Sequence, residues 1–296
     1  MNKTTYNILV PIDFSEQSLF ALEQAIGIAK AVEGNLNLLY IHHDKKGVLS
    51  KLFSDDQAAL FDKAVEEKLL QLAREKSTSH GIKIDFELAH ATSVATKIIN
   101  VSEEKKSAMI VMGKGRLCDE GMEMLIIGSV TSRVIRYSKI PVISVGHKVS
   151  NSQCKNILLP LDLTKETRQK VSWGIQMARI FNAKIKVVSV LWEKNNAAVV
   201  KPLVAQMKQV TGFIRKAGVE VDAKIIESDK GSASLVPLLT KYIEEEDINL
   251  ALIMTQQEND ISQFFLGSTA TEFIRKSPVP VMSITPRETG EIIWGF

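Results

Sequence analysis

The chain contains one sequence pattern twice, and this duplication limits its fold more than any other feature. Residues 7–15 read NILVPIDFS and residues 156–164 read NILLPLDLT, so the two copies are offset by 149 residues. Near the end of each copy, IPVISV at 140–145 corresponds to VPVMSI at 279–284, with an offset of 139 residues. A period this long indicates a duplicated domain and not a solenoid. We therefore expect one fold that occurs twice in tandem.

The length and composition exclude several functions. The 296 residues suffice for two domains with separate cores, which we place at 1–147 and 154–296. A net charge of +3 gives no reason to expect a nucleic-acid partner, and no apolar run approaches the roughly 20 residues of a membrane span. The first predicted strand begins within seven residues of the start, which leaves no room for a signal peptide. With only two cysteines, Cys118 and Cys154, we expect a cytoplasmic protein without disulfides.

Each half alternates short apolar segments with segments of helical periodicity. Strands separated by single helices predict right-handed crossovers and therefore a doubly wound parallel sheet of the α/β class. The expected strands are 7–12, 37–42, 82–89, 108–112 and 142–145 in the first half, and about 156–161, 185–191, 219–226, 249–254 and 280–284 in the second. The expected helices of the first half begin after Ser15 and at about 58, 93 and 129, with an exposed loop at 44–57.

Two loops of the first half carry groups that can bind phosphate. Open parallel sheets bind ligands beyond the carboxyl ends of their strands, where the strand order reverses. Asp13 follows the first strand, MGKGR at 112–116 follows the fourth, and GSVT at 128–131 opens the next helix. Glycines let backbone N–H groups approach phosphate oxygens, and a helix N-terminus adds unsatisfied donors. Lys114 and Arg116 add positive charge, and Asp13 can bind a ribose hydroxyl or a magnesium ion.

Each of these pieces also has a purely structural interpretation. Gly128-Ser129 is a common start of a helix, Asp13 can be a helix cap, and Gly113 and Gly115 can be turn residues. The combination at the ends of strands one and four is what favours a phosphate site.

The sequence resembles the universal stress proteins over nearly its whole length, as a tandem member with two domains. The resemblance rests on VPIDFS at 10–15, VMG at 111–113 with the glycine loop, and IPVISV at 140–145. It implies a Rossmann-like fold of the adenine nucleotide alpha-hydrolase type, with two doubly wound domains of five parallel strands each. Many members bind ATP through Gly-x2-Gly-x9-Gly-Ser/Thr, the strand-one aspartate and the end of strand two. Carried onto this sequence, the implied nucleotide contacts are Pro11, Asp13, Ile41, Met112, Gly113, Gly115, Gly128, Ser129, Val130 and Thr131.

The glycine loop of the first half departs from this pattern. One residue instead of two separates Gly113 from Gly115, and twelve instead of nine separate Gly115 from Gly128. The loop also contains three acidic residues that would repel phosphates if they turned inward, Asp119, Glu120 and Glu123.

The second half departs further. It keeps Asp162 and Gly267-Ser268, but it has no glycine between Gly231 and Gly267, and its loop reads MTQQEND at 254–260. Side chains crowd the approach of a triphosphate there, and Glu258 and Asp260 add like charge. We therefore expect nucleotide binding in the N-terminal domain and its loss in the C-terminal domain.

No catalytic or metal motif stands out. Neither a Ser-His-Asp spacing nor a Cys-x2-Cys motif nor a Walker sequence is present. His42 and His43 end a predicted strand, where neighbours point to opposite faces and cannot easily chelate one metal, so we expect a structural or solvent role for them.

Three functions remain open. The first is a stress-response protein, not an enzyme, which binds ATP or another adenine nucleotide, with magnesium possible at Asp13, and acts by nucleotide-linked association. The second is a non-nucleotide-binding interaction or scaffold module. The third is a slow ATPase on the same fold. The resemblance also implies that the two domains form an internal pseudo-dimer and leaves a homodimer possible.

Overall fold

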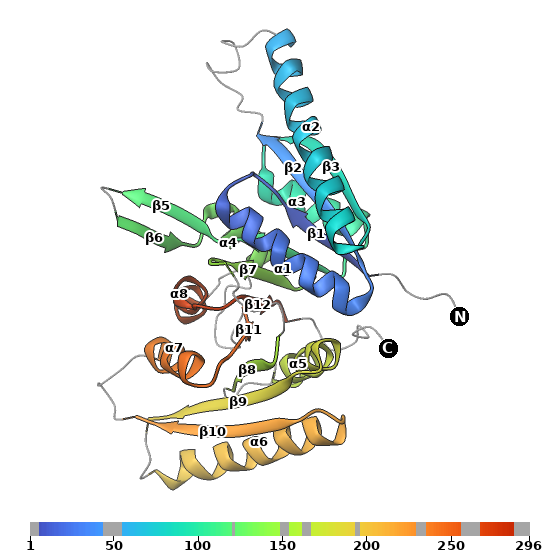
Figure 1. Ribbon diagram of the computed structural model, residues 1–296. Coiled ribbons are helices and arrows are strands. Elements are labelled where there is room, and N and C mark those ends of the chain that lie inside the picture. Colours follow the sequence, from blue (N-terminus) through green and yellow to red (C-terminus); the bar gives the residue numbers. More distant parts are fainter. Residues whose placement is uncertain are drawn as a thin grey trace. The chain divides into compact units, whose positions relative to one another are not determined.

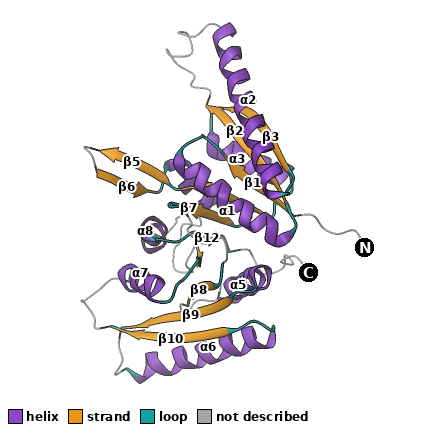
Figure 2. Cartoon of the chain, in the orientation of Figure 1, coloured by secondary structure: helices purple, strands orange, loops and turns teal. Residues whose placement is uncertain are grey.

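The computed structural model of the chain describes residues 6–43, 55–119, 122–148, 154–161, 167–192, 196–228, 235–255 and 267–286. The chain divides into two compact units, one with Met1–Val134 and Val142–Ser152, the other with Ile135–Pro141 and Gln153–Phe296. Both units combine a parallel sheet with helices (Figure 1, Figure 2). The α/β class with five parallel strands in each unit is therefore confirmed. The predicted limits of 1–147 and 154–296 stay predictions.

The sheet of the first unit has the strand order β3-β2-β1-β4-β7, and all of its pairs are parallel. Ile8, Leu9 and Val10 in the centre of β1 are completely buried, as a strand covered on both faces requires. The order reverses between β1 and β4, which lie side by side. The bounds of the strands are β1 Asn7–Pro11, β2 Asn35–His43, β3 Ile84–Ala91, β4 Met109–Gly113 and β7 Val142–Val145.

Four helices cover this sheet, with α1 and α2 on one face and α3 and α4 on the other (Figure 1). Ser15 caps α1 by accepting a hydrogen bond from the Ser18 amide, and Ser93 caps α3 in the same way from Thr96. The caps fix where each helix begins after its strand, and so they position the loops at one edge of the sheet. The bounds are α1 Glu16–Val32, α2 Asp55–His80, α3 Val94–Glu104 and α4 Ser129–Tyr137.

The segment between β4 and α4 is not the loop that the sequence pattern predicted. It contains a two-stranded antiparallel hairpin, β5 Gly115–Asp119 and β6 Met122–Ile126, in which Gly115 pairs with Ile126 and Asp119 with Met122. The hairpin extends away from the sheet (Figure 1). The sequence signal for it was the two-residue connection Glu120-Gly121 between two short apolar runs.

The second unit repeats the topology, with the strand order β10-β9-β8-β11-β12. No helix in the described part of the chain has the length and apolar character needed to span a membrane. The strands are β8 Asn156–Pro160, β9 Lys184–Leu191, β10 Val221–Glu227, β11 Leu250–Met254 and β12 Val281–Ile284. The helices are α5 Thr167–Phe181, α6 Ala197–Lys216, α7 Leu235–Glu245 and α8 Ser268–Lys276.

The structure describes the side chain of Cys154 but not that of Cys118. Cys154 is a free, buried thiol, and its burial raises its pKa to about 12. Because the thiolate is the reactive form, this thiol is inert near neutral pH. The side chain of Cys118 lies outside the described residues.

Candidate functional site

A cavity of about 290 Å³ lies at the reversal point of the first unit, beyond the carboxyl ends of β1 and β4. This is the place at which open α/β sheets bind their ligands. All ten residues predicted from the sequence line this one cavity: Pro11, Asp13, Ile41, Met112, Gly113, Gly115, Gly128, Ser129, Val130 and Thr131. The fold therefore brings together residues that lie up to 120 positions apart in the sequence, from Pro11 to Thr131.

The sequence reasoning missed the apolar wall of this cavity. Leu39 lies two residues before Ile41 on β2, so both side chains share one face of the strand. Val94 and Ile98 lie one turn apart in α3 and complete the wall. Two sequence patterns could have indicated this wall: the spacing of two residues between the β2 side chains and the spacing of four between the α3 side chains. An apolar wall of this kind suits a planar base.

Asp13 supports the turn from β1 to α1, although it is not the helix cap. The Asp13 carboxylate accepts hydrogen bonds from the Ser15 amide at 2.9 Å and from the Ser15 hydroxyl at 2.5 Å. Ser15 is the residue that caps α1. The pair holds the exposed carboxylate at the edge of the cavity, in an orientation set by the helix.

Phe14 lies between these two residues in an unusual conformation. Its φ angle is 61°, a region that bulky side chains rarely occupy and that is found most often at functional turns. Its ring contacts that of Tyr40, with centroids 5.8 Å apart, and Lys68 Nζ lies 4.2 Å from the ring centroid. These contacts hold the strained turn and so fix the position of Asp13.

Lys114 is the buried cation of the cavity. It follows β4, its backbone N–H donates to the Val145 carbonyl at 2.8 Å, and the residue is only 3% exposed. Burial lowers the pKa of its amine to about 8. An anion beside this amine would favour the protonated form, so the site can couple anion binding to proton uptake. The side chain of Arg116, the other predicted cation, lies outside the described residues.

The N-terminus of α4 faces the cavity through Ser129, Val130 and Thr131. The first amides of a helix have no partner within the helix and carry the positive end of its dipole. The Thr131 hydroxyl donates to the Gly113 carbonyl at 3.0 Å, and this hydrogen bond fastens α4 to β4. This hydroxyl thus has a structural role, and the amides are the groups of the helix end that can bind an anion.

The glycines of the cavity differ in whether an added side chain would fit. A Cβ on Gly113 would lie 2.8 Å from the backbone carbon of Gln17 in α1, which is closer than real Cβ atoms approach. Gly113 is the last residue of β4 and not a turn residue, so packing against α1 requires it. Among the described residues, the atom closest to a Cβ on Gly128 is the Gly115 Cα at 3.5 Å, so the described backbone leaves room there.

Gly113→Ala is therefore expected to destabilise the first unit by about 1–3 kcal/mol, the usual cost of overpacking a core. Gly128→Ala is the matched control, because its added methyl makes only ordinary contacts. Chemical denaturation of both variants measures the difference. Equal stability of the two would show that α1 moves away from β4 without cost.

The second unit lacks two of these features within its described part, the glycine at the end of the strand and the buried lysine after it. The backbone N–H of Thr255 donates to the Ile284 carbonyl, as Lys114 does to Val145, so Met254 takes the place of Gly113 and Thr255 that of Lys114. Gly267 precedes α8, and no described residue lies within 4 Å of a Cβ placed on it. Asp162, Glu258 and Asp260 lie outside the described residues.

The parallel sheet with a cavity at its reversal point defines a Rossmann-like α/β protein. The chain belongs to the universal stress protein family, because residues 5–146 and 153–284 each match the family described as "Universal stress protein family". The resemblance noted in the sequence is thereby confirmed, together with the tandem arrangement.

Two relatives found by sequence each match about one half of the chain. A universal stress protein of Methanocaldococcus jannaschii is 30% identical over 142 residues, which are 47% of this chain and 80% of that protein. The universal stress protein YxiE of Bacillus subtilis is 28% identical over 149 residues, 47% of this chain and 97% of its own length. The crystal structure of a universal stress protein from Archaeoglobus fulgidus covers 96% of this chain and 97% of its own, with a TM-score of 0.72 and 22% identity. This last likeness supports the fold of the whole tandem chain.

Proposed function

We propose that this universal stress protein binds an adenine nucleotide in the cavity of its first unit and acts through nucleotide-linked association rather than turnover. The observation that carries the proposal is that the ten residues taken from the family pattern line one cavity at the reversal point of the sheet. The residue types match the parts of a nucleotide. Apolar side chains from β2 and α3 suit the base, and the α4 amides with Lys114 suit the phosphates.

Magnesium fits this donor set only together with a nucleotide. Asp13 is the one carboxylate among the described residues that line the cavity. Magnesium ions bound with nucleotides commonly take one or two protein carboxylates and complete their coordination with phosphate oxygens and water. Asp13 would therefore hold the ion against the phosphates and would not bind it alone.

Identification of the small molecule that accompanies the purified protein tests the proposal directly. Mass spectrometry of the ligand released from the freshly purified full chain is expected to find an adenine nucleotide. Titration calorimetry with ATP and magnesium should then give saturable heat at one site per chain. Absence of both signals would favour the scaffold alternative, in which the chain acts through its surface without a nucleotide.

Turnover is expected to be absent. The titratable side chains among the described residues of the cavity are Asp13 and Lys114, and the Asp13 carboxylate already accepts two hydrogen bonds from Ser15. The release of ADP or AMP from ATP should therefore be equally slow for the wild-type chain and for Asp13→Ala. A rate that is well above background and falls in the variant would instead support the slow-ATPase alternative.

The partners of the chain follow from the tandem architecture. We expect the two domains to form an internal pseudo-dimer, and a homodimer stays a prediction, as does the cytoplasmic location. Sedimentation of the full chain with and without ATP and magnesium measures whether nucleotide changes the association state. An identical sedimentation profile under both conditions would contradict association linked to the nucleotide.

A further inference from the structure

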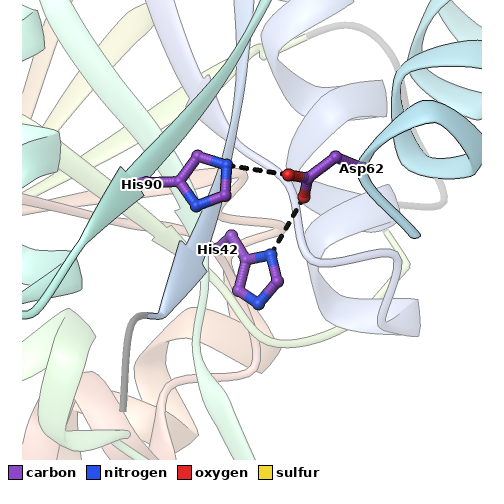
Figure 3. Close-up of side chains that lie close together, drawn as sticks. All are labelled: His42, Asp62 and His90. Atoms are coloured by element: carbon purple, nitrogen blue, oxygen red, sulfur yellow. Dashed lines mark hydrogen bonds and ion pairs between the residues drawn. The ribbon is translucent and has the colours of Figure 1, made fainter. Parts of the chain in front are cut away.

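Two histidines and one aspartate from three separate elements meet on the first unit. His42 is on β2, His90 on β3 and Asp62 on α2 (Figure 3). The register of the parallel pair places His42 directly beside His90. The sequence could not indicate this cluster, because the three residues share no motif and only the strand register and the docking of α2 bring them together.

The Asp62 carboxylate lies between the two imidazoles. His42 Nδ1 is 3.0 Å from Asp62 Oδ1, and His90 Nε2 is 3.0 Å from Asp62 Oδ2. The two imidazole rings stack with centroids 5.0 Å apart and an interplanar angle of 25°. Phe61 contacts the His42 ring from its edge at a centroid distance of 5.4 Å and limits the space that this ring can sample.

The geometry points to a binding site for a divalent first-row transition ion, with Zn²⁺ as the ion that suits two imidazoles and one carboxylate. One ligand atom from each residue can be chosen so that all three lie within 4.8 Å of one another. A tetrahedral zinc ion with bonds of about 2.0–2.1 Å needs its ligand atoms about 3.3–3.4 Å apart. The three ligand atoms must therefore move closer together when an ion of this kind binds.

The exposure of the cluster allows an ion to enter. The exposed side-chain fractions are 32% for His42, 26% for Asp62 and 45% for His90. A site with three protein ligands leaves at least one coordination position open to water or to an external ligand. The site is thus of the open type and not of the closed structural type.

The cluster is distinct from the nucleotide cavity. Ile41 lines the cavity, whereas the next residue of the strand, His42, points to the opposite face, where α2 supplies Asp62. The sequence-based expectation that His42 and His43 do not share one metal agrees with this geometry. The ligand partner of His42 is the cross-strand His90 instead of its neighbour.

Zinc titration of the untagged, nucleotide-free full chain tests the proposal. Calorimetry is expected to show one saturable site, and Co²⁺ should give visible absorption bands of a four- or five-coordinate ion. His90→Ala and Asp62→Asn should weaken zinc binding by at least the roughly 10–100-fold that loss of a supporting hydrogen bond costs at metal sites. His43→Ala is the matched control, because it removes the adjacent imidazole from the other face, and it should bind as the wild type does.

Comparison of the variants shows whether zinc binds at this cluster or elsewhere on the chain. Saturating zinc should raise the melting temperature of the wild type and of His43→Ala, but not that of His90→Ala. Gly128→Val should keep zinc binding, because it alters only the nucleotide cavity. The proposal is overturned if the wild type shows no saturable site, if His43→Ala weakens binding as much as His90→Ala does, or if binding is lost in Gly128→Val. Circular dichroism of each variant confirms that the fold is retained.

Discussion

Replacement of Gly128 by valine is expected to weaken ATP binding by at least roughly 100-fold, or about 2.7 kcal/mol. Gly128 lies directly before α4, where the first helical amides face the cavity. Its Cα is open toward the cavity, because an added Cβ would approach nothing closer than 3.5 Å. The two methyl groups of valine would occupy the space that a phosphate needs. Titration calorimetry with ATP and magnesium measures the loss.

Gly267→Val is the matched control for this experiment. Gly267 precedes α8 of the second unit as Gly128 precedes α4, and no described residue lies within 4 Å of a Cβ placed on Gly267. The control should bind ATP as tightly as the wild type does. Both variants should have the same melting temperature as the wild type. If Gly267→Val removes binding and Gly128→Val does not, the nucleotide site lies in the second unit and the proposal for the first fails.

ATP binding is expected to weaken roughly tenfold between pH 7 and pH 9 because of Lys114. Burial lowers the pKa of this amine to about 8, so it is mostly protonated at pH 7 and mostly neutral at pH 9 in the free protein. Bound phosphate favours the protonated form and raises this pKa in the complex. At pH 9 the amine must therefore take up a proton from solvent when the ligand binds. Part of the binding free energy is used for this protonation.

Lys114→Met tests this assignment, because methionine has a similar length and suits a buried position. The variant should bind ATP more weakly than the wild type at pH 7 and should lose the change between pH 7 and pH 9. Persistence of the pH dependence in Lys114→Met would show that another group titrates.

Unfolding gives an independent measurement of the same group. The folded pKa of Lys114 is about 8 and its ordinary value is 10.5, so the unfolded chain holds the proton over that interval and the folded chain does not. The contribution of Lys114 to the free energy of unfolding should accordingly rise with pH between about 8 and 10.5. The difference in free energy of unfolding between the wild type and Lys114→Met should change by that increment across this range.

The parts of the fold that depend on local pattern were predictable. The continuous apolar run of β1, the Ser15 cap and the limits of α4 and β7 follow from burial and helix-end chemistry within short segments. The hairpin of β5 and β6 was predicted as a loop, because a two-stranded ribbon buries little and its apolar signal is short.

The candidate site was predictable only as far as the family pattern reached. Sequence alone determined the duplication and the doubled parallel fold, because repeats and strand motifs are properties of the chain itself. The resemblance to the family supplied the ten residues that line one cavity. Only the tertiary structure shows that close packing against Gln17 requires a glycine at position 113. It also shows that burial lowers the pKa of Lys114. It further brings His42 together with His90 and Asp62. Each of these depends on contacts between elements distant in sequence, and only the register of the strands and the docking of the helices set such contacts.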